Sequence, residues 1–169
     1  KGIWLKKDDS LTLNKQPLIT IGITCFNAEK TLERALLGAL NQDWPNFEII
    51  VVDDASTDSS KVILKKYELK IKNISIYYQT VNKGCANSRN IVISKAKGEF
   101  IAFFDDDDFS RSERIRLQYN YLINYEKKES AELVACFASG YRIYPNGYKK
   151  KINAVGSFGI PPIGLKMAN

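Results

Sequence analysis

The sequence predicts an α/β fold with a mostly parallel central sheet, helices on both faces and an antiparallel C-terminal portion. Two observations support this prediction. Short runs rich in β-branched residues alternate with longer segments whose apolar residues recur at helical spacing, and this order is typical of strands joined by helices. The apolar runs also end in polar residues, as expected where parallel strands reach a ligand-binding edge.

The folded domain is expected to occupy residues 18–169, after a polar lead-in over residues 1–17. The 169 residues are 44% hydrophobic, which is sufficient for the core of one domain. No signal peptide is evident, and three cysteines far apart in sequence favour a reduced, cytoplasmic compartment. Because the chain ends at Asn169 without an obvious finishing element, we expect the domain to be truncated at its C-terminal end.

Four apolar runs are predicted as strands, at residues 18–23, 47–52, 74–78 and 100–104. Each of the first three is followed by a predicted helix, and these cover about residues 32–40, 56–67 and 86–96. Leucines and alanines at helical spacing indicate the first helix, and the capping side chains of residues 56–59 indicate the start of the second. Strands that alternate with helices in this way predict a parallel sheet.

The C-terminal portion is predicted to begin with an amphipathic helix over about residues 112–126, where apolar residues again recur at helical spacing. Strands are predicted at residues 133–139, 141–144 and 148–152. Pro145-Asn146-Gly147 is typical of a turn, so the strands on either side of it should run antiparallel.

The polar segments after the four strands should converge at one edge of the sheet, because the carboxyl ends of parallel strands point the same way. These segments are Thr24–Asn27, Asp53–Asp54, Asn82–Gly84 and Asp105–Asp108. Four polar segments at one edge indicate a binding site.

Four consecutive aspartates, Asp105–Asp108, follow the fourth predicted strand directly. Carboxylates side by side repel one another unless a cation compensates them, and a hard divalent metal is the simplest such cation. Alternate residues suit this role, so Asp105 and Asp107 are predicted as metal ligands. The alternative is that the aspartates are exposed and cap the following helix. The chain has no histidine, so its chemistry must use carboxylates, amides, hydroxyls, Lys and Arg.

Four groups of residues carry a family resemblance: Gly22–Asn27; Val51–Asp58; Asn82–Gly84 with Ser88–Asn90; and Gly98–Glu99 with Phe104–Asp108. In order and spacing, over about residues 18–110, they resemble family 2 glycosyltransferases with the Rossmann-like GT-A fold. The resemblance implies an inverting enzyme of cell-surface or extracellular glycan synthesis. It would transfer a sugar from a nucleotide-sugar donor, usually a UDP-sugar, to an acceptor hydroxyl.

The resemblance also implies roles for individual residues at the base of the nucleotide. Thr24 and Phe26 would flank the base, with Phe26 stacking on it, and Asp54 would hydrogen-bond it. A planar base offers a π-face to an aromatic ring and a ring N–H to a carboxylate, which agrees with these two residue types. Asn27, in the same segment as Thr24 and Phe26, is included in the predicted nucleotide-sugar site.

At the diphosphate and sugar, Asn82, Gly84 and Arg89 would line the donor. The D-x-D equivalent is Asp105-Asp106-Asp107, and it would hold Mn²⁺ or Mg²⁺ through Asp105 and Asp107, with Asp107 the most dependable ligand of the motif. Asp105 and Asp106 are also counted as nucleotide-sugar-binding residues. A divalent cation in this position would stabilise the charge that develops on the leaving diphosphate.

The general base of the family lies in an acidic motif further along the chain, and no convincing match occurs before Asn169. We therefore expect the base to lie beyond Asn169, and expect these 169 residues to bind donor with weak or no transfer. The acceptor is expected to be a glycan or a lipid-linked molecule, which is compatible with peripheral association with the cytoplasmic face of a membrane. Nucleic acid is not expected as a partner, because the basic residues are scattered and the predicted crevice is acidic.

Each assigned residue also has a simpler interpretation. Thr24 and Asn27 could end a strand and cap a helix, and Asp54 could cap the next helix. Arg89 could be a surface residue paired with a neighbour, and Phe26 could belong to the core.

Three other functions fit parts of the pattern. A non-catalytic nucleotide-sugar-binding module would keep the donor pocket without the reaction. A phosphoacceptor receiver domain would use Asp53-Asp54 and Asp105 as its acidic pocket, and a haloacid-dehalogenase-like phosphatase would use the D-x-D strand. The phosphatase usually has that strand first in its fold, whereas three strand–helix units precede it here.

Overall fold

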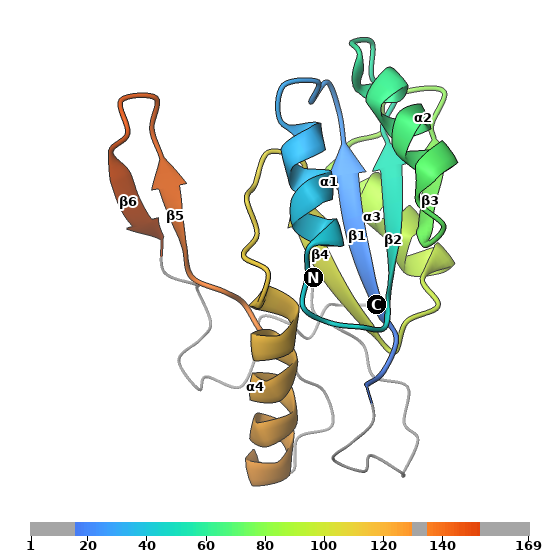
Figure 1. Ribbon diagram of the computed structural model, residues 1–169. Helices are drawn as coiled ribbons and strands as arrows, with labels where there is room; N and C mark the ends of the chain where they lie inside the picture. Colours follow the sequence, from blue (N-terminus) through green and yellow to red (C-terminus); the bar gives the residue numbers. More distant parts are fainter. Residues whose placement is uncertain (1–15, 130–134, 153–169) are drawn as a thin grey trace. The chain divides into compact units, whose positions relative to one another are not determined.

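The computed structural model describes residues 16–129 and 135–152 of the chain (Figure 1). These residues belong to two compact units that meet after Arg116 in sequence. The first described unit contains the sheet and its covering helices, and the second contains most of one helix and a hairpin. None of the described helices has the length and apolar character needed to cross a membrane.

The sheet of the first unit has four parallel strands in the spatial order β3-β2-β1-β4 (Figure 1). The strands are β1 (Ile19–Cys25), β2 (Phe47–Asp53), β3 (Ile74–Tyr78) and β4 (Phe100–Asp105). All four predicted strands are confirmed, with ends within two residues of those predicted. The register pairs Thr24 of β1 with Val52 on one side and Asp105 on the other, so the strands end close together.

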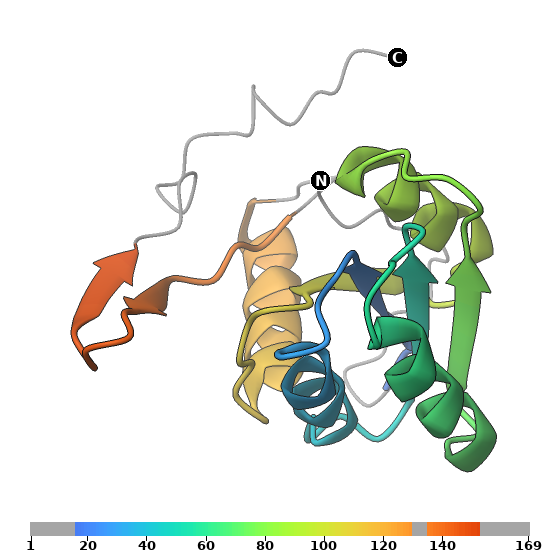
Figure 2. The same cartoon turned by 90° about the horizontal axis from the view of Figure 1, so that it is seen from above.

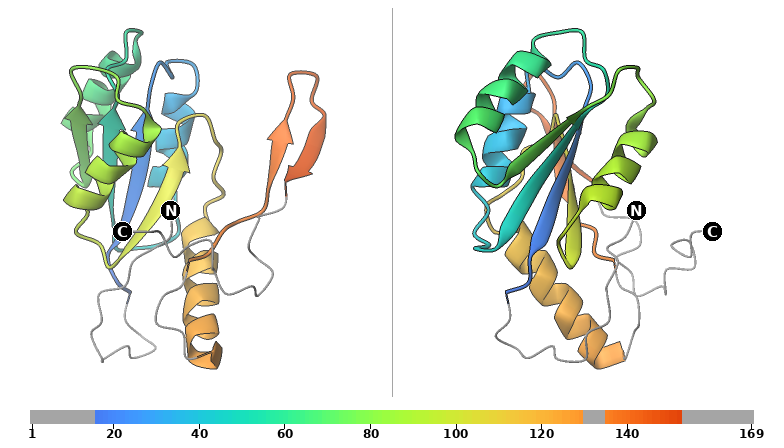
Figure 3. Two further views of the ribbon diagram at one scale, coloured as in Figure 1. Left: turned by 180° about the vertical axis from the view of Figure 1, so that it is seen from behind. Right: turned by 90° about the vertical axis from the view of Figure 1, so that its right-hand side faces the viewer.

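Helices cover both faces of this sheet, as predicted. Helix α1 (Leu32–Leu40) and helix α2 (Ser60–Lys70) lie on one face, and helix α3 (Cys85–Lys95) lies on the other (Figures 2 and 3). The β1 and β2 side chains are almost entirely buried because these inner strands are covered from both sides.

The core under α3 is formed by Ile50, Val52 and Val92, with the partly buried Phe103 packed against them. Gly22 on β1 permits this packing. A Cβ atom at Gly22 would lie 2.5 Å from Cγ1 of Val92, which is closer than two carbon atoms can approach. The absence of a side chain at Gly22 therefore sets how closely α3 approaches the sheet.

Helix α4 (Arg114–Glu129) continues from the first unit into the second. The second unit also contains an antiparallel hairpin, in which β5 (Gly140–Ile143) pairs with β6 (Lys149–Ile152). In its turn Gly147 has a φ of 81° and its N–H donates to the carbonyl of Tyr144 over 2.8 Å. The antiparallel C-terminal portion is thus confirmed.

The predicted strand at residues 133–139 is wrong over its described part, residues 135–139. The carbonyl oxygen of Cys136 accepts a hydrogen bond from Nε2 of Gln118 over 3.3 Å, in place of a strand amide. No strand in the described part of the chain pairs with this segment, and an apolar run without a pairing partner does not form a strand. Residues 133 and 134 lie outside the described residues.

Candidate functional site

The four polar segments that follow the strands meet at the carboxyl edge of the sheet, within the first unit. The backbone N–H of Phe26, after β1, donates to Oδ2 of Asp106, after β4, over 3.1 Å. The N–H of Asp54, after β2, donates to the carbonyl of Cys25 over 2.8 Å. The segment after β3 is bonded to Asp54 in turn, so the convergence predicted from parallel strands is present.

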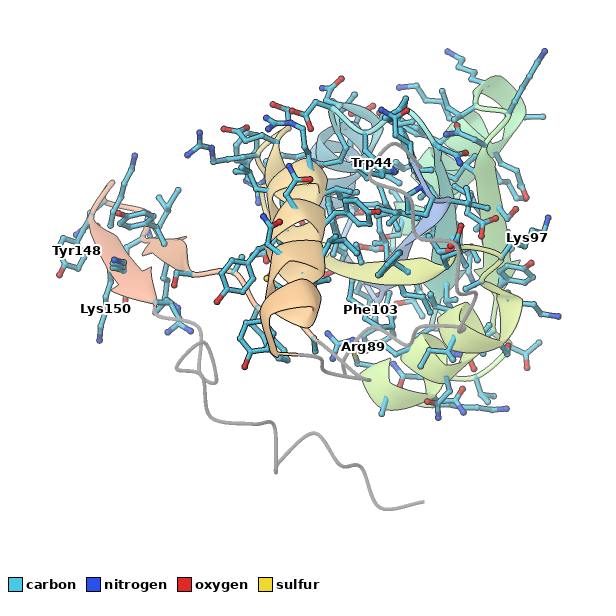
Figure 4. All side chains as sticks on the ribbon, turned by 90° about the horizontal axis from the view of Figure 1, so that it is seen from below. Trp44, Arg89, Lys97, Phe103, Tyr148 and Lys150 are labelled. Carbon is cyan, nitrogen blue, oxygen red and sulfur yellow. The ribbon has the colours of Figure 1, made fainter. Side chains whose placement is uncertain are left out.

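Asp105 forms an ion pair at this edge of the sheet. Its Oδ1 lies 3.0 Å from a guanidinium nitrogen of Arg89, on α3, with side-chain exposures of 52% for Asp105 and 34% for Arg89. The guanidinium also lies over the ring of Phe103, 5.6 Å from its centroid (Figure 4). Arg89 is thus paired with a neighbour, but that neighbour belongs to the acidic segment, so the pair lies inside the predicted site.

The other aspartates of the segment are crowded. Burial raises the pKa of Asp106, and the carboxylates of Asp107 and Asp105 raise it further. Burial also raises the pKa of Asp108, together with the charges of Asp105 and Asp107. Helix α4 begins only at Arg114, so none of the four aspartates occupies its N-cap position. The helix-cap alternative for this segment is therefore wrong.

The acidic segment suits a hard divalent cation in its chemistry. Such ions bind one or two protein carboxylates and complete their coordination with water and phosphate oxygens. Asp105 and Asp107 are exposed and alternate along the chain, so two hard oxygen donors are available. Among the described residues no group of three or more His, Cys, Asp or Glu side chains is arranged around a common metal position.

Asp54 is buried, with 3% of its surface exposed, and it binds the segment after β3. Its Oδ1 accepts the N–H of Lys83 over 2.8 Å, and its Oδ2 accepts the N–H of Gly84 over 2.7 Å. Gly84 has a φ of 83°, a conformation that favours glycine, and its own N–H is shared with Oδ1 of Asn82 over 3.1 Å. Helix α2 has Ser59 as its N-cap, so Asp54 does not cap it.

The segment after β1 presents an exposed aromatic ring. Phe26 is 47% exposed, so it is not a core residue. Oγ1 of Thr24 lies 3.4 Å from Sγ of Cys85, which connects the end of β1 to the start of α3. Asn27 has a φ of 50°, and its Oδ1 accepts hydrogen bonds from the N–H (2.8 Å) and the hydroxyl (3.3 Å) of Thr57. The side-chain oxygen of Asn27 thus holds two loops together and does not cap α1, which begins after Thr31.

The sequence-based prediction missed two polar groups at this edge. Gln79 directly follows the last residue of β3, and its Nε2 donates to Oδ1 of Asp54 over 2.7 Å. Arg34, on α1, donates a hydrogen bond to the backbone carbonyl of Asp107. The rule that ligand sites form at strand ends could have identified Gln79. No signal in the sequence indicated that a residue of α1 reaches the acidic segment.

The model of the family described as "Glycosyl transferase family 2" matches residues 20–159, most of the chain. An uncharacterized glycosyltransferase of Haemophilus influenzae is 35% identical over 138 residues, which cover 81% of this chain and 55% of the relative. The poly(ribitol-phosphate) beta-N-acetylglucosaminyltransferase TarS of Staphylococcus aureus is 34% identical over 96 residues, 56% of this chain and 17% of TarS.

Two solved structures are similar in fold. S. aureus TarS 1-349 in complex with UDP has a TM-score of 0.58 and 31% identity, covering 64% of this chain and 32% of that one. The mannosyltransferase PcManGT of Pyrobaculum calidifontis, in complex with GDP-Man and Mn²⁺, has a TM-score of 0.54 and 25% identity, covering 57% of this chain and 29% of that one. The chain thus spans about half, or less, of the length of the proteins that it matches.

Proposed function

Because this chain belongs to glycosyltransferase family 2, we propose that the carboxyl edge of its sheet binds a nucleotide-sugar donor, a UDP-sugar, for transfer of the sugar to an acceptor hydroxyl. The observation that carries the proposal is the convergence of Phe26, Asp54, Arg89 and the acidic segment at that edge. Family membership also excludes the receiver-domain and phosphatase alternatives.

The base is proposed to bind beside Phe26 and Asp54. The exposed ring of Phe26 offers an apolar face, and stacking on such a face orients a planar base. A carboxylate can accept about four hydrogen bonds, and Asp54 accepts three from protein donors. Its remaining acceptor position would bind a ring N–H of the base, with Thr24 on the opposite side.

The diphosphate and sugar are proposed to lie between the segment after β3 and the acidic segment. Asn82, Gly84 and Arg89 would contact them, with the guanidinium of Arg89 supplying positive charge. Asp105 and Asp107 would hold Mn²⁺ or Mg²⁺, which as a Lewis acid stabilises negative charge on the leaving diphosphate. Asp106, through its hydrogen bond to the N–H of Phe26, keeps the acidic segment next to the base-binding segment.

Donor class and acceptor follow from the relatives only as parts of this proposal. We propose UDP and not GDP as the nucleotide of the donor, because the TarS structure bound to UDP is more similar to this chain than the PcManGT structure bound to GDP-Man. TarS is described as a poly(ribitol-phosphate) transferase, which supports a cell-surface polymer or its lipid-linked precursor as acceptor. The donor would then come from the cytoplasm, and the protein would act at the cytoplasmic face of the membrane. No described residue is assigned as the general base, and its position stays a prediction.

The experiment is calorimetric titration of the full-length protein with UDP, with and without Mn²⁺. Asp107→Ala should abolish the Mn²⁺-dependent part of UDP affinity. Asp43→Ala is the matched control, because Asp43 is also an exposed aspartate. Asp43 lies in the connection from α1 to β2, at the opposite edge of the sheet, and pairs with Arg116. The proposal is wrong if the unmodified protein binds no UDP in either condition, or if the two variants behave alike. Tighter binding of GDP than of UDP would correct the donor class.

A further inference from the structure

Gln79 lies at the carboxyl end of β3, an edge strand of the sheet, and contacts Asp54 of the proposed donor site. It follows the last residue of β3, and its backbone N–H donates to the carbonyl of Asp53 over 2.8 Å, which continues the strand pairing by one residue. Its side chain is partly buried. The direction of its amide is therefore determined by contacts with the protein on several sides.

Both N–H groups of the Gln79 amide are used within the protein. Nε2 donates to Oδ1 of Asp54 over 2.7 Å and to Oγ of Ser88 over 2.9 Å. Ser88 lies on α3 and is completely buried, and Asp54 is nearly so. One amide nitrogen therefore joins the end of β2 to the side of α3. A side-chain amide can do this because its NH₂ group carries two donor hydrogens.

The network extends to two groups that the proposed site uses. Asp54 binds the N–H groups of Lys83 and Gly84, so the conformation of the segment that would contact the diphosphate depends on the position of the Asp54 carboxylate. Ser88 directly precedes Arg89, so the anchor on Ser88 also determines where α3 presents that guanidinium to Asp105.

We infer that Gln79 is a positioning residue of the donor site. Through Asp54 and Ser88 it holds residues 82–84 and Arg89 in the relative positions that favour binding of the diphosphate. The inference rests on the proposed function for the identity of the ligand. The role of Gln79 is indirect, because its amide protons are both bound by protein. It differs from the role of Asp54, since Asp54 retains an acceptor position for the base.

Gln79→Met tests this role, because methionine has a similar length and shape but no N–H donor. Gln42→Met is the matched control. Nε2 of Gln42 likewise donates twice, to the carbonyls of Gly38 (2.9 Å) and Arg111 (2.8 Å), but Gln42 lies in the connection at the opposite edge of the sheet. Gln79→Met loses two hydrogen bonds and Gln42→Met loses three, because Oε1 of Gln42 also accepts the N–H of Ile115 over 3.1 Å. A general loss of stability should therefore be at least as large in the control.

Two measurements in the full-length protein decide the matter. The first is amide hydrogen exchange at Lys83 and Gly84, which needs no ligand. We expect Gln79→Met, and not Gln42→Met, to reduce their protection roughly tenfold, the effect of losing one hydrogen bond to a charged group. The second is the ratio of affinities for UDP and uridine, which should fall in Gln79→Met alone, since the base contact of Asp54 is retained.

Unchanged protection at Lys83 and Gly84 in Gln79→Met would overturn the inference. So would an equal loss of UDP and uridine affinity, because that result would mean a structural role without selection for the diphosphate. Ser88→Ala combined with Gln79→Met should add little to either effect, and fully additive effects would exclude a shared anchor. If the unmodified protein bound no UDP, the proposed function would fail, and the exchange result would still decide whether Gln79 positions the segment.

Discussion

Aspartates lie at the carboxyl ends of two strands of the same sheet, β2 and β4, and their surroundings are opposite. Asp54, after β2, is 3% exposed and accepts three hydrogen bonds from protein N–H groups. Asp105, after β4, has a half-exposed side chain with one arginine partner, and it is followed by three more carboxylates. The protein itself satisfies the first carboxylate, whereas the second group leaves most of its acceptor positions to solvent or to a ligand. Aspartates at the ends of two strands thus differ in how many acceptor positions the protein itself occupies.

The largest expected effect is on stability at the buried member of the pair. Asp54→Ala removes three hydrogen bonds to a buried carboxylate, from Lys83, Gly84 and Gln79, and should lower the free energy of unfolding by roughly 3 kcal/mol. Asp105→Ala should change it by less than about 1 kcal/mol, because partly exposed ion pairs contribute little. Urea unfolding followed by circular dichroism measures both. Equal losses of stability in the two variants would contradict the contrast between a carboxylate bonded mainly by the protein and one left mainly to solvent or ligand.

A smaller effect concerns the Arg89–Asp105 ion pair and donor affinity. Asp105→Asn removes the pair but also removes one of four crowded like charges, so stability should hardly change while Mn²⁺-dependent UDP affinity falls about tenfold or more. Glu33→Gln is a suitable control, since the Lys66–Glu33 pair has the same 3.0 Å separation but no neighbouring carboxylate cluster. The control should leave UDP affinity unchanged. Calorimetry with UDP distinguishes the two variants, and a comparable loss in both would rule out a specific role for Asp105.

The smallest expected effect is on the reactivity of the Cys25 thiol. Cys25 is the last residue of β1, the strand between β2 and β4. Burial, followed by the negative charges of Asp106 and Asp53, raises the pKa of Cys25 to about 12. Between the ordinary thiol pKa and about pH 12, the folded state therefore keeps the proton that the unfolded state loses. The stability associated with this thiol is fully present below the ordinary pKa and is lost as the pH rises towards 12.

Alkylation with iodoacetamide, followed by mass spectrometry, measures this directly. At pH 8 the exposed Cys85 should react much faster than the buried Cys25. Asp106→Asn should increase the Cys25 rate only slightly, since burial and not charge is the main cause of the shift. Similar rates for the two cysteines in the unmodified protein would show that the carboxyl edge is open around β1.

The order of the strands and helices followed from local pattern, because apolar runs and helical spacing report burial without reference to distant residues. The strands of the sheet, the helices on both faces and the turn before β6 were all predicted in this way. Residues 135–139 were not, since an apolar run forms a strand only where a partner strand is available, and pairing is a long-range property.

By itself the sequence determined which residues after the strands reach the carboxyl edge, because every parallel strand ends there and the residues after each strand can be read in order. Only the tertiary structure decided what each group does. It buried Asp54 under the N–H groups of Lys83 and Gly84, exposed the ring of Phe26 and paired Arg89 with Asp105. The physical reason is that the burial and hydrogen bonding of a side chain depend on segments far away in sequence, which local pattern does not encode.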